Sequence, residues 1–173
     1  EEGVNCPVFS SNLDSECLHW YSSIIPADEL QPTPEWFHTC SEVEILSPPD
    51  VAFGSQEPAD GGGYAGMVTF SFSNMGYRAI IGIELISTLN VGQTYYVEFK
   101  VSALNQFGNY CTTNNLGFNF STHPNYHRDA FPINQSHYSV DTNITFSDSW
   151  TEISVEFTAD SAYSYLHLGN FFD

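Results

Sequence analysis

Positively charged residues are almost absent from this chain. Only Arg78, Lys100 and Arg128 oppose 21 acidic residues among its 173, and the formal net charge is −18. Nucleic acids and anionic membrane surfaces bind proteins through a basic face that releases counterions. The composition therefore excludes both as partners. It suits a neutral or cationic partner, bound calcium or simple solubility.

Long apolar runs and helical apolar stripes are missing as well. The longest mainly apolar run, residues 79–86, is far shorter than the roughly 20 residues that a membrane-spanning helix needs. No segment of helical length repeats its apolar side chains with a period of about 3.6 residues. We therefore expect neither membrane insertion nor a helical core.

The four cysteines lack the spacing of zinc and redox motifs. They are Cys6, Cys17, Cys40 and Cys111, an even number at irregular intervals. This pattern favours disulfides, an oxidising compartment and a secreted protein, although it leaves all three possible pairings open. The chain begins at Glu1 without methionine or an apolar signal segment, which is typical of a mature or excised piece of such a protein.

What the chain does contain is a period of two after residue 64. In QTYYVEFKVSAL, apolar and aromatic side chains at 95, 97, 99 and 101 alternate with the residues at 96, 98, 100 and 102. Further short strands are predicted in GMVTFSF, YRAIIGIEL, NLGFNFS, SHYSVDTNITF, WTEISVEFTA and YSYLHLGNF. Such strands, separated by Gly, Asn, Ser and Pro, predict an all-β antiparallel sandwich.

The first 60 residues differ, because seven of the nine prolines lie there. Proline at this density blocks helix interiors and central strands. We predict one domain over residues 1–173, with residues 1–60 as an irregular, disulfide-tied covering segment and residues 64–173 as the core sandwich. Within the covering segment, TPEWFHTC predicts one short helical turn with Thr33 as N-cap and Pro34 at the first helical position.

The stretch FGSQEPADGGGYAGM, residues 53–67, is the least ordinary. Its glycines predict positive φ angles at Gly61 to Gly63 and a tight turn that leads onto the sheet. The alternative is that Gln56, Glu57 and Asp60 contact a ligand.

Several segments together resemble a domain common in secreted and surface proteins of Bacteroidetes, associated with gliding and type IX secretion. They are TPEWFHTCS, FGSQEPADGGGYAGM, YRAIIGIELISTLNVGQTYYVEFKVSAL, NNLGFNFS and LHLGNFF, in this order over nearly the whole chain. The resemblance implies a jelly-roll of the galactose-binding type, similar in architecture to carbohydrate-binding modules. It also aligns Cys6 with Cys40, which leaves Cys17 to pair with Cys111.

The same resemblance implies a structural calcium site near strands at the two chain ends. Glu1, Glu2 and Asp173 are the residues that would contribute to it, together with carbonyls or waters. The alternative is that these acids are solvated charged ends.

Two loops combine aromatic rings with amides and charged groups, as a sugar site requires. The predicted ligand-binding residues are Asn105, Gln106, Phe107, Asn109, Tyr110, Asn125, Tyr126, His127, Arg128 and Asp129. In a jelly-roll, loops at one end converge, so these two could form one site. The alternative is that the loop aromatics cover the ends of the core.

Catalytic motifs are lacking: there is no G-x-S-x-G elbow and no Cys-His pair, and Glu57 with Asp60 lies in a glycine-rich turn without rigid support. His123, His127 and His137 are interpreted as loop histidines rather than metal ligands. We therefore expect a secreted, non-catalytic carbohydrate-binding module of a cell-surface protein, whose partner is a polysaccharide or glycan. The alternative is a structural or adhesive module that contacts neighbouring protein domains without binding sugar.

Overall fold

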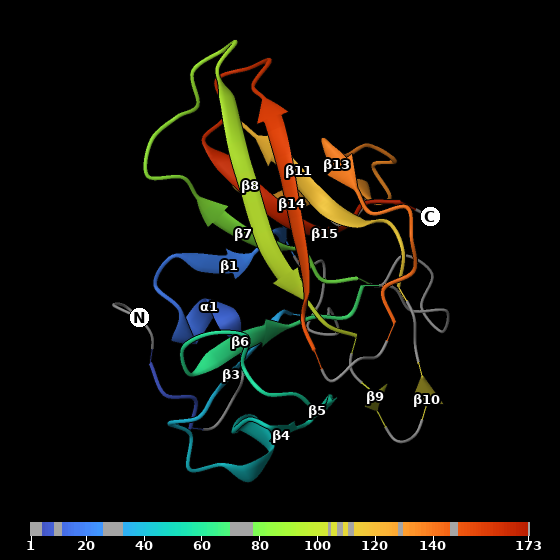
Figure 1. Cartoon of the computed structure of the whole chain (residues 1–173). Coiled ribbons are helices and arrows are strands. Elements are labelled where there is room, and N and C mark those ends of the chain that lie inside the picture. Colours follow the sequence, from blue (N-terminus) through green and yellow to red (C-terminus); the bar gives the residue numbers. More distant parts are fainter. Residues whose placement is uncertain are drawn as a thin grey trace.

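The computed structural model shows a chain built mostly of β-strands (Figure 1). It describes residues 5–8, 12–25, 33–69, 78–103, 105–106, 109–110, 113–127, 130–145 and 149–172. At 105–106 and 109–110 the description covers the backbone alone. Within these ranges no helix is long and apolar enough to cross a membrane.

A five-stranded antiparallel sheet is the largest element of the fold. Its strands, in spatial order, are β1 (Trp20–Ser22), β7 (Ile81–Glu84), β15 (Tyr165–Asn170), β11 (Leu116–Ser121) and β13 (Tyr138–Ser139). Strand β15 lies at its centre, between β7 and β11. The predicted antiparallel β-structure is therefore confirmed.

Two eight-residue strands form a second layer. Strands β8 (Thr94–Val101) and β14 (Thr151–Thr158) pair along their whole length, and this ribbon crosses in front of the sheet in Figure 1. The alternation predicted for β8 is confirmed, since Val97 is buried whereas Tyr96 is 63% exposed. One face of the ribbon is therefore inside the protein and the other faces solvent.

The main core lies between the ribbon and the sheet. Phe157 of β14 stacks on Phe120 of β11 with ring centroids 4.7 Å apart, and Phe118 meets Phe157 edge-on at 6.2 Å. Leu89 and Ala159 complete the buried part of this cluster. Burial of one such aromatic ring favours folding by roughly 1.5–3 kcal/mol, so this contact holds the two layers together.

The first 66 residues contain short regular elements, whereas an irregular segment was the prediction for residues 1–60. They are α1 (Leu13–Glu16), β2 (Ile24–Ile25), β3 (Glu35–His38), the 3₁₀ helix η1 (Glu44–Leu46), β4 (Asp50–Val51), β5 (Gly54–Ser55) and β6 (Gly63–Gly66). Three of the described prolines flank these elements: Pro34 precedes β3, Pro49 precedes β4, and Pro58 follows β5. At such positions proline removes no ladder hydrogen bond.

Three further short strands lie later in the chain, namely β9 (Asn105–Gln106), β10 (Asn109–Tyr110) and β12 (Tyr126–His127). Strands β9 and β10 form a small antiparallel hairpin, and β12 pairs with β2 in parallel.

The helical turn predicted in TPEWFHTC is wrong, because residues 35–38 form β3. This strand pairs antiparallel with β6, so that Trp36 lies opposite Ala65 and Phe37 opposite Tyr64. Phe37 is completely buried. A strand sends Phe37 into the core while its neighbours point the other way, and this long-range pairing overrides the local capping signal.

Helix α1 covers the outer edge of β1. The backbone N–H of Ser22 donates to the carboxylate of Asp14, and Asn12 caps the helix through a 3.0 Å hydrogen bond to the backbone N of Asp14. The apolar side of the helix packs through Leu13 on Ile81 of β7. This helix therefore satisfies a donor that the sheet edge would otherwise expose.

The predicted disulfide between Cys6 and Cys40 is confirmed. The predicted partnership of Cys17 with Cys111 is wrong for Cys17, which carries a free, buried thiol; Cys111 lies outside the described residues. Cys17 follows α1 and packs in an apolar cluster with Leu13. Burial, with a smaller effect of the neighbouring acid Glu16, raises the pKa of this thiol to about 11, so it behaves as a small apolar side chain.

The three consecutive glycines are needed for two separate reasons, a positive φ angle at the first and lack of space for a side chain at the other two. Only Gly61 has the predicted positive φ, at 60°. Gly62 and Gly63 are required for space, since a Cβ on Gly62 would lie 2.7 Å from Nε2 of His38 and one on Gly63 would lie 2.6 Å from the Phe37 carbonyl oxygen. The turn onto the sheet thus needs one flexible residue and two small ones.

Candidate functional site

The stretch 53–67 begins with a buried glutamine that joins two parts of the fold. Gln56 is 4% exposed, and its Oε1 accepts a 2.8 Å hydrogen bond from Oγ of Ser102, just beyond β8. Its backbone N donates to the carbonyl of Pro49 at 2.7 Å. Gln56 therefore fastens the β4–β5 hairpin to the end of the ribbon, and it is too buried to be the ligand contact considered from the sequence.

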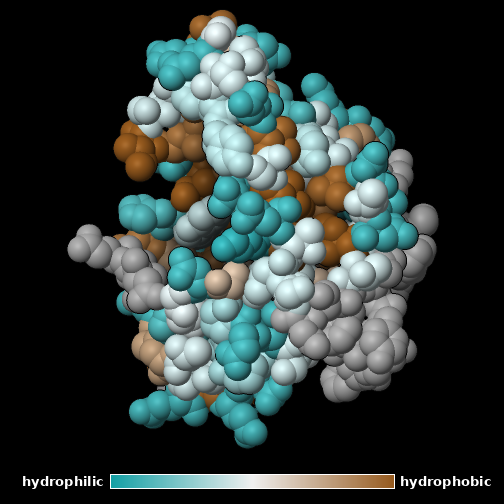
Figure 2. Space-filling view, in the orientation of Figure 1, coloured by the Kyte–Doolittle hydropathy of each residue, from teal (hydrophilic) through white to brown (hydrophobic). Residues whose placement is uncertain are grey.

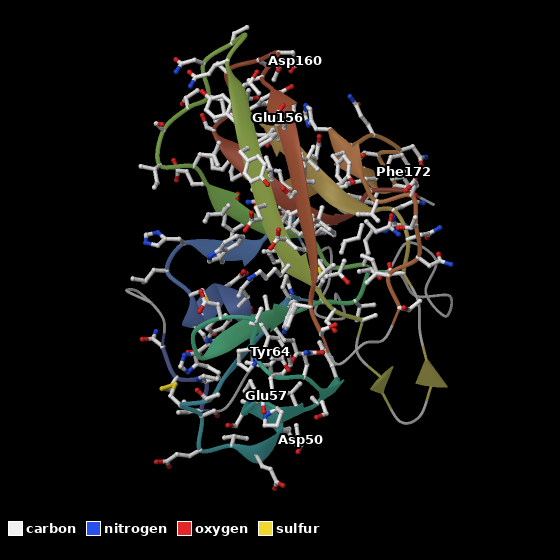
Figure 3. All side chains as sticks on the ribbon, viewed as in Figure 1. Asp50, Glu57, Tyr64, Glu156, Asp160 and Phe172 are labelled. Carbon is white, nitrogen blue, oxygen red and sulfur yellow. A yellow bond between two sulfur atoms is a disulfide. The ribbon has the colours of Figure 1, made fainter. Side chains whose placement is uncertain are left out.

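Near Gln56 lies a surface that we call the acidic–aromatic surface. It consists of Asp50, Glu57 and Trp150, which lie near the buried ring of Tyr64. The rings of Tyr64 and Trp150 meet edge to face with centroids 5.5 Å apart. Trp150 Nε1 donates a 2.7 Å hydrogen bond to the Glu57 carbonyl, which anchors the loop after β5 beside the indole. Figure 3 shows Tyr64, Glu57 and Asp50 in the same lower part of the molecule.

The electrostatics of this surface are negative. Burial raises the pKa of Tyr64 to about 12, and the carboxylates of Glu57 and Asp50 add to the rise. Both carboxylates are exposed, whereas Tyr64 is buried. Among the described residues the Tyr64 hydroxyl has no hydrogen-bond partner. The surface therefore offers acceptors to hydroxyl or ammonium donors, and it repels anions.

The first predicted loop lies beside this surface. Strand β9 packs against β5, so the hairpin of Asn105, Gln106, Asn109 and Tyr110 adjoins the segment that carries Glu57. Phe107 lies outside the described residues. The asparagine-rich hairpin and the stretch 53–67 are thus neighbours, a juxtaposition that the sequence alone does not reveal.

The second predicted loop packs against a different element. Tyr126 on β12 pairs with Ile24 of β2 and is 8% exposed; its hydroxyl accepts a 2.9 Å hydrogen bond from Nδ2 of Asn119. An interior ring offers no free face, so the expectation that Tyr126 stacks on a sugar is wrong. Asn125 and His127 are exposed, while Arg128 and Asp129 lie outside the described residues.

A buried polar network behind Tyr126 was missed at the sequence level. His167 on β15 is completely buried, with Nδ1 2.7 Å from Oγ of Ser23 and Nε2 2.8 Å from Oγ of Ser121. Ser121 gives its hydroxyl proton to the His123 carbonyl, so Nε2 of His167 carries the ring proton and Nδ1 accepts from Ser23.

Space for this network comes from Gly82, the partner of His167 in β7, where a Cβ would lie 2.3 Å from Oγ of Ser23. Burial lowers the pKa of His167 to about 4, and the imidazole is neutral. The only signal in the sequence is a histidine in a strand whose neighbours on both sides are apolar.

A second hydrogen-bonded network lies at the upper end of the ribbon. The backbone N of Phe120 donates to Nδ1 of His137, whose Nε2 is 3.0 Å from the Tyr163 hydroxyl; this hydroxyl donates to Asp160 at 2.6 Å. Burial lowers the pKa of His137, and the Tyr163 hydrogen bond lowers that of Asp160. This second network orients side chains around the Phe120 ring.

Among the described residues, one group of three side chains has metal-binding chemistry, namely Cys6, His38 and Cys40, and its two sulfurs form the disulfide. The predicted calcium ligands Glu1, Glu2 and Asp173 lie outside the described residues.

The comparisons with known proteins found no matching family model, no matching curated protein and no matching solved structure. The resemblance to a Bacteroidetes surface domain therefore stays a prediction.

Proposed function

We propose that this chain is a secreted, non-catalytic carbohydrate-binding module with a jelly-roll fold of the galactose-binding type. Its binding site consists of the acidic–aromatic surface and the adjoining β9–β10 hairpin. The observation that carries the proposal is the packing of β9 against β5, which puts an asparagine-rich hairpin beside the exposed carboxylate of Glu57.

The chemistry of this surface suits a sugar. Sugar rings stack their C–H faces on aromatic side chains, while their hydroxyls need acceptors and donors nearby. Trp150 is only partly buried, and its indole is held in place through Nε1. Carboxylates at Glu57 and Asp50 accept hydrogen bonds from hydroxyls. With a net charge of −18, a neutral or cationic glycan is favoured over an anionic one.

A role in binding without catalysis agrees with the hydrogen bonding of Asp60, the acid nearest to Glu57 in the sequence. Asp60 accepts a 2.8 Å hydrogen bond from the backbone N of Gly61, so its carboxylate stabilises the turn before β6. The disulfide fits the oxidising compartment of a secreted protein. Calcium at Glu1, Glu2 and Asp173 belongs to the proposal as a structural ion.

The proposal is tested by affinity electrophoresis with neutral, cationic and anionic soluble polysaccharides, each with and without calcium. A hydrogen bond to a charged acceptor is worth about 1.5–3 kcal/mol, so Glu57→Gln should weaken retention by roughly tenfold or more. Tyr110→Ala tests the hairpin. Tyr96→Ala is the matched control, because this exposed tyrosine lies on the outer face of the ribbon. Absence of retention by every polysaccharide would overturn the proposal.

A second candidate function is adhesion to protein through an apolar surface near β1. Leu18 is 73% exposed, Trp20 on β1 is 37% exposed, and Ile86 just beyond β7 is fully exposed. Figure 2 shows apolar side chains at the surface near the connection from β7 to β8. Sedimentation velocity over a range of concentrations tests this function: association that Leu18→Ser abolishes, together with no glycan binding, would favour it.

A further inference from the structure

Three side chains with metal-binding chemistry meet where the N-terminal segment is joined to β3. One ligand atom each from Cys6, His38 and Cys40 lie within 4.8 Å of one another. Both cysteines are exposed, so a reductant can reach the disulfide, which Figure 3 draws as a yellow bond. The grouping is independent of the acidic–aromatic surface and of the proposed function.

The histidine of this group is held in place. Nδ1 of His38 accepts a 3.0 Å hydrogen bond from the backbone N of Cys40. On the other side, the ring lies against Gly62 and Gly63, where added Cβ atoms would be 2.7 Å from Nε2 and 2.8 Å from Cδ2. Trp36 flanks it with ring centroids 5.8 Å apart. The imidazole is thus fixed beside Cys40 by the backbone of both paired strands.

We propose that reduction of the Cys6–Cys40 disulfide creates a zinc site made of these two thiolates and His38. A dithiol supplies two electrons and two protons, which break the S–S bond and leave two thiols, while the dithiol itself becomes a disulfide. Zn²⁺ then displaces both thiol protons and binds two sulfurs and one ring nitrogen. A water molecule fills the fourth, open position, as in zinc sites with three protein ligands.

The geometry of the folded chain suits this ion. Zn–S bonds of about 2.3 Å and Zn–N bonds of about 2.0 Å at tetrahedral angles place ligand atoms roughly 3.5–3.8 Å apart. The three ligand atoms already lie within 4.8 Å of one another, and the Cα atoms of the two cysteines are 5.7 Å apart. Rotation about the side-chain bonds of the freed cysteines brings the sulfurs into place, and His38 binds through Nδ1 by exchanging its hydrogen bond from the Cys40 backbone N for the bond to zinc. In the oxidised protein the sulfurs are bonded to each other and bind no zinc.

The test uses the full chain with Cys17→Ser and Cys111→Ser, so that Cys6 and Cys40 are the only thiols. The protein is reduced with a dithiol, which is removed under anaerobic conditions, and it is titrated with Co²⁺ as a visible probe. We expect one equivalent of Co²⁺ to give the absorption of a tetrahedral thiolate complex, and one equivalent of Zn²⁺ to abolish it. The oxidised protein should give no such absorption.

Matched variants distinguish a metal site formed by the folded protein from nonspecific metal binding by the two freed thiols. His38→Gln should lose the one-to-one complex, whereas His19→Gln, at an exposed position in the same segment, should keep it. Zn²⁺ should also raise the melting temperature of the reduced protein and leave that of the oxidised protein unchanged. The proposal is overturned if reduced protein gives no Co²⁺ absorption, if His38→Gln leaves the complex unchanged, or if zinc leaves the melting temperature of the reduced protein unchanged.

Discussion

The neutral histidine inside the sheet makes the stability of this protein sensitive to acid. His167 is completely buried, and both ring nitrogens are occupied by serine hydroxyls, with Ser23 donating to Nδ1 and Ser121 accepting from Nε2. Protonation of the imidazole would put a second ring proton on Nδ1, which now accepts a hydrogen bond from Ser23. Burial away from water also disfavours the charged imidazolium. The folded protein therefore holds this residue neutral at pH values at which the unfolded chain protonates it.

The size of the effect follows from proton linkage. The pKa of His167 falls from 6.5 in the unfolded chain to about 4 in the folded protein. Above pH 6.5 neither state is protonated there, and this residue contributes no pH dependence. Between pH 6.5 and 4 the unfolded state binds one more proton, so stability falls by about 1.4 kcal/mol per pH unit as pH decreases. Across that window the loss from His167 is roughly 3 kcal/mol.

Urea unfolding at a series of pH values from 7.5 to about 4.5, with the disulfide intact, measures this loss. His167→Gln keeps one donor and one acceptor but does not titrate. We expect it to be less stable at pH 7.5 and to lose much less stability on acidification than the parent chain. His127→Gln, at an exposed position, is the control and should retain the parental slope. Equal slopes for His167→Gln and the parent would refute the reasoning.

Three further predictions concern packing, a tyrosine and the disulfide. Gly117→Ala places a Cβ 1.9 Å from the Tyr138 carbonyl oxygen, so it should destabilise the protein by about 1–3 kcal/mol in urea unfolding, unless β13 can shift away at no cost. Asp160→Asn should lower the pKa of Tyr163 from about 12, since the carboxylate adds to the effect of burial; ultraviolet titration measures it, and an unchanged pKa would contradict the hydrogen bond. Replacing both bridged cysteines by serine opens a loop of 34 residues and should cost roughly 2–5 kcal/mol; an unchanged urea midpoint would show that the bridge adds no stability.

The strands that the sequence predicts correctly are those with one dry and one wet face. In β8, buried Val97 alternates with exposed Tyr96 and Glu98, and the period of two is therefore visible in the residue types. Strand β14 shows the same alternation, since buried Ile153 lies between exposed Glu152 and Ser154. Strand β11 is instead buried along its whole length, and the sequence marks it through its two phenylalanines, which pack in the core. For these segments local pattern and tertiary position agree.

The errors occur where a distant segment decides the structure. Glu35–His38 has the cap and proline of a helical turn, yet its pairing with β6 makes it a strand. Tyr126 stands among polar loop residues, yet β2 and His167 enclose it, with the ring of Tyr126 4.8 Å from that imidazole. Neither enclosure is encoded within a few neighbouring residues, so no window of sequence could have revealed it.

The candidate site was predicted only in part for the same reason. The asparagine-rich hairpin is recognisable from its composition, but its position beside Glu57 depends on the contact of β9 with β5. The contribution of Trp150 depends on a hydrogen bond that spans 93 residues. The residue types in the sequence indicated a site of amides, acids and aromatic rings, and the fold determines which of these residues lie next to one another.

The position of α1 has a consequence for how this protein can assemble. An approaching chain that sought to extend the sheet at β1 would have to displace the Asp14 carboxylate from the backbone N–H of Ser22, and it would meet a negative charge on the way. Edge-to-edge strand pairing, which can extend a sheet into fibres, is thereby opposed at β1. Association at this side is left to side chains such as Trp20, which is 37% exposed.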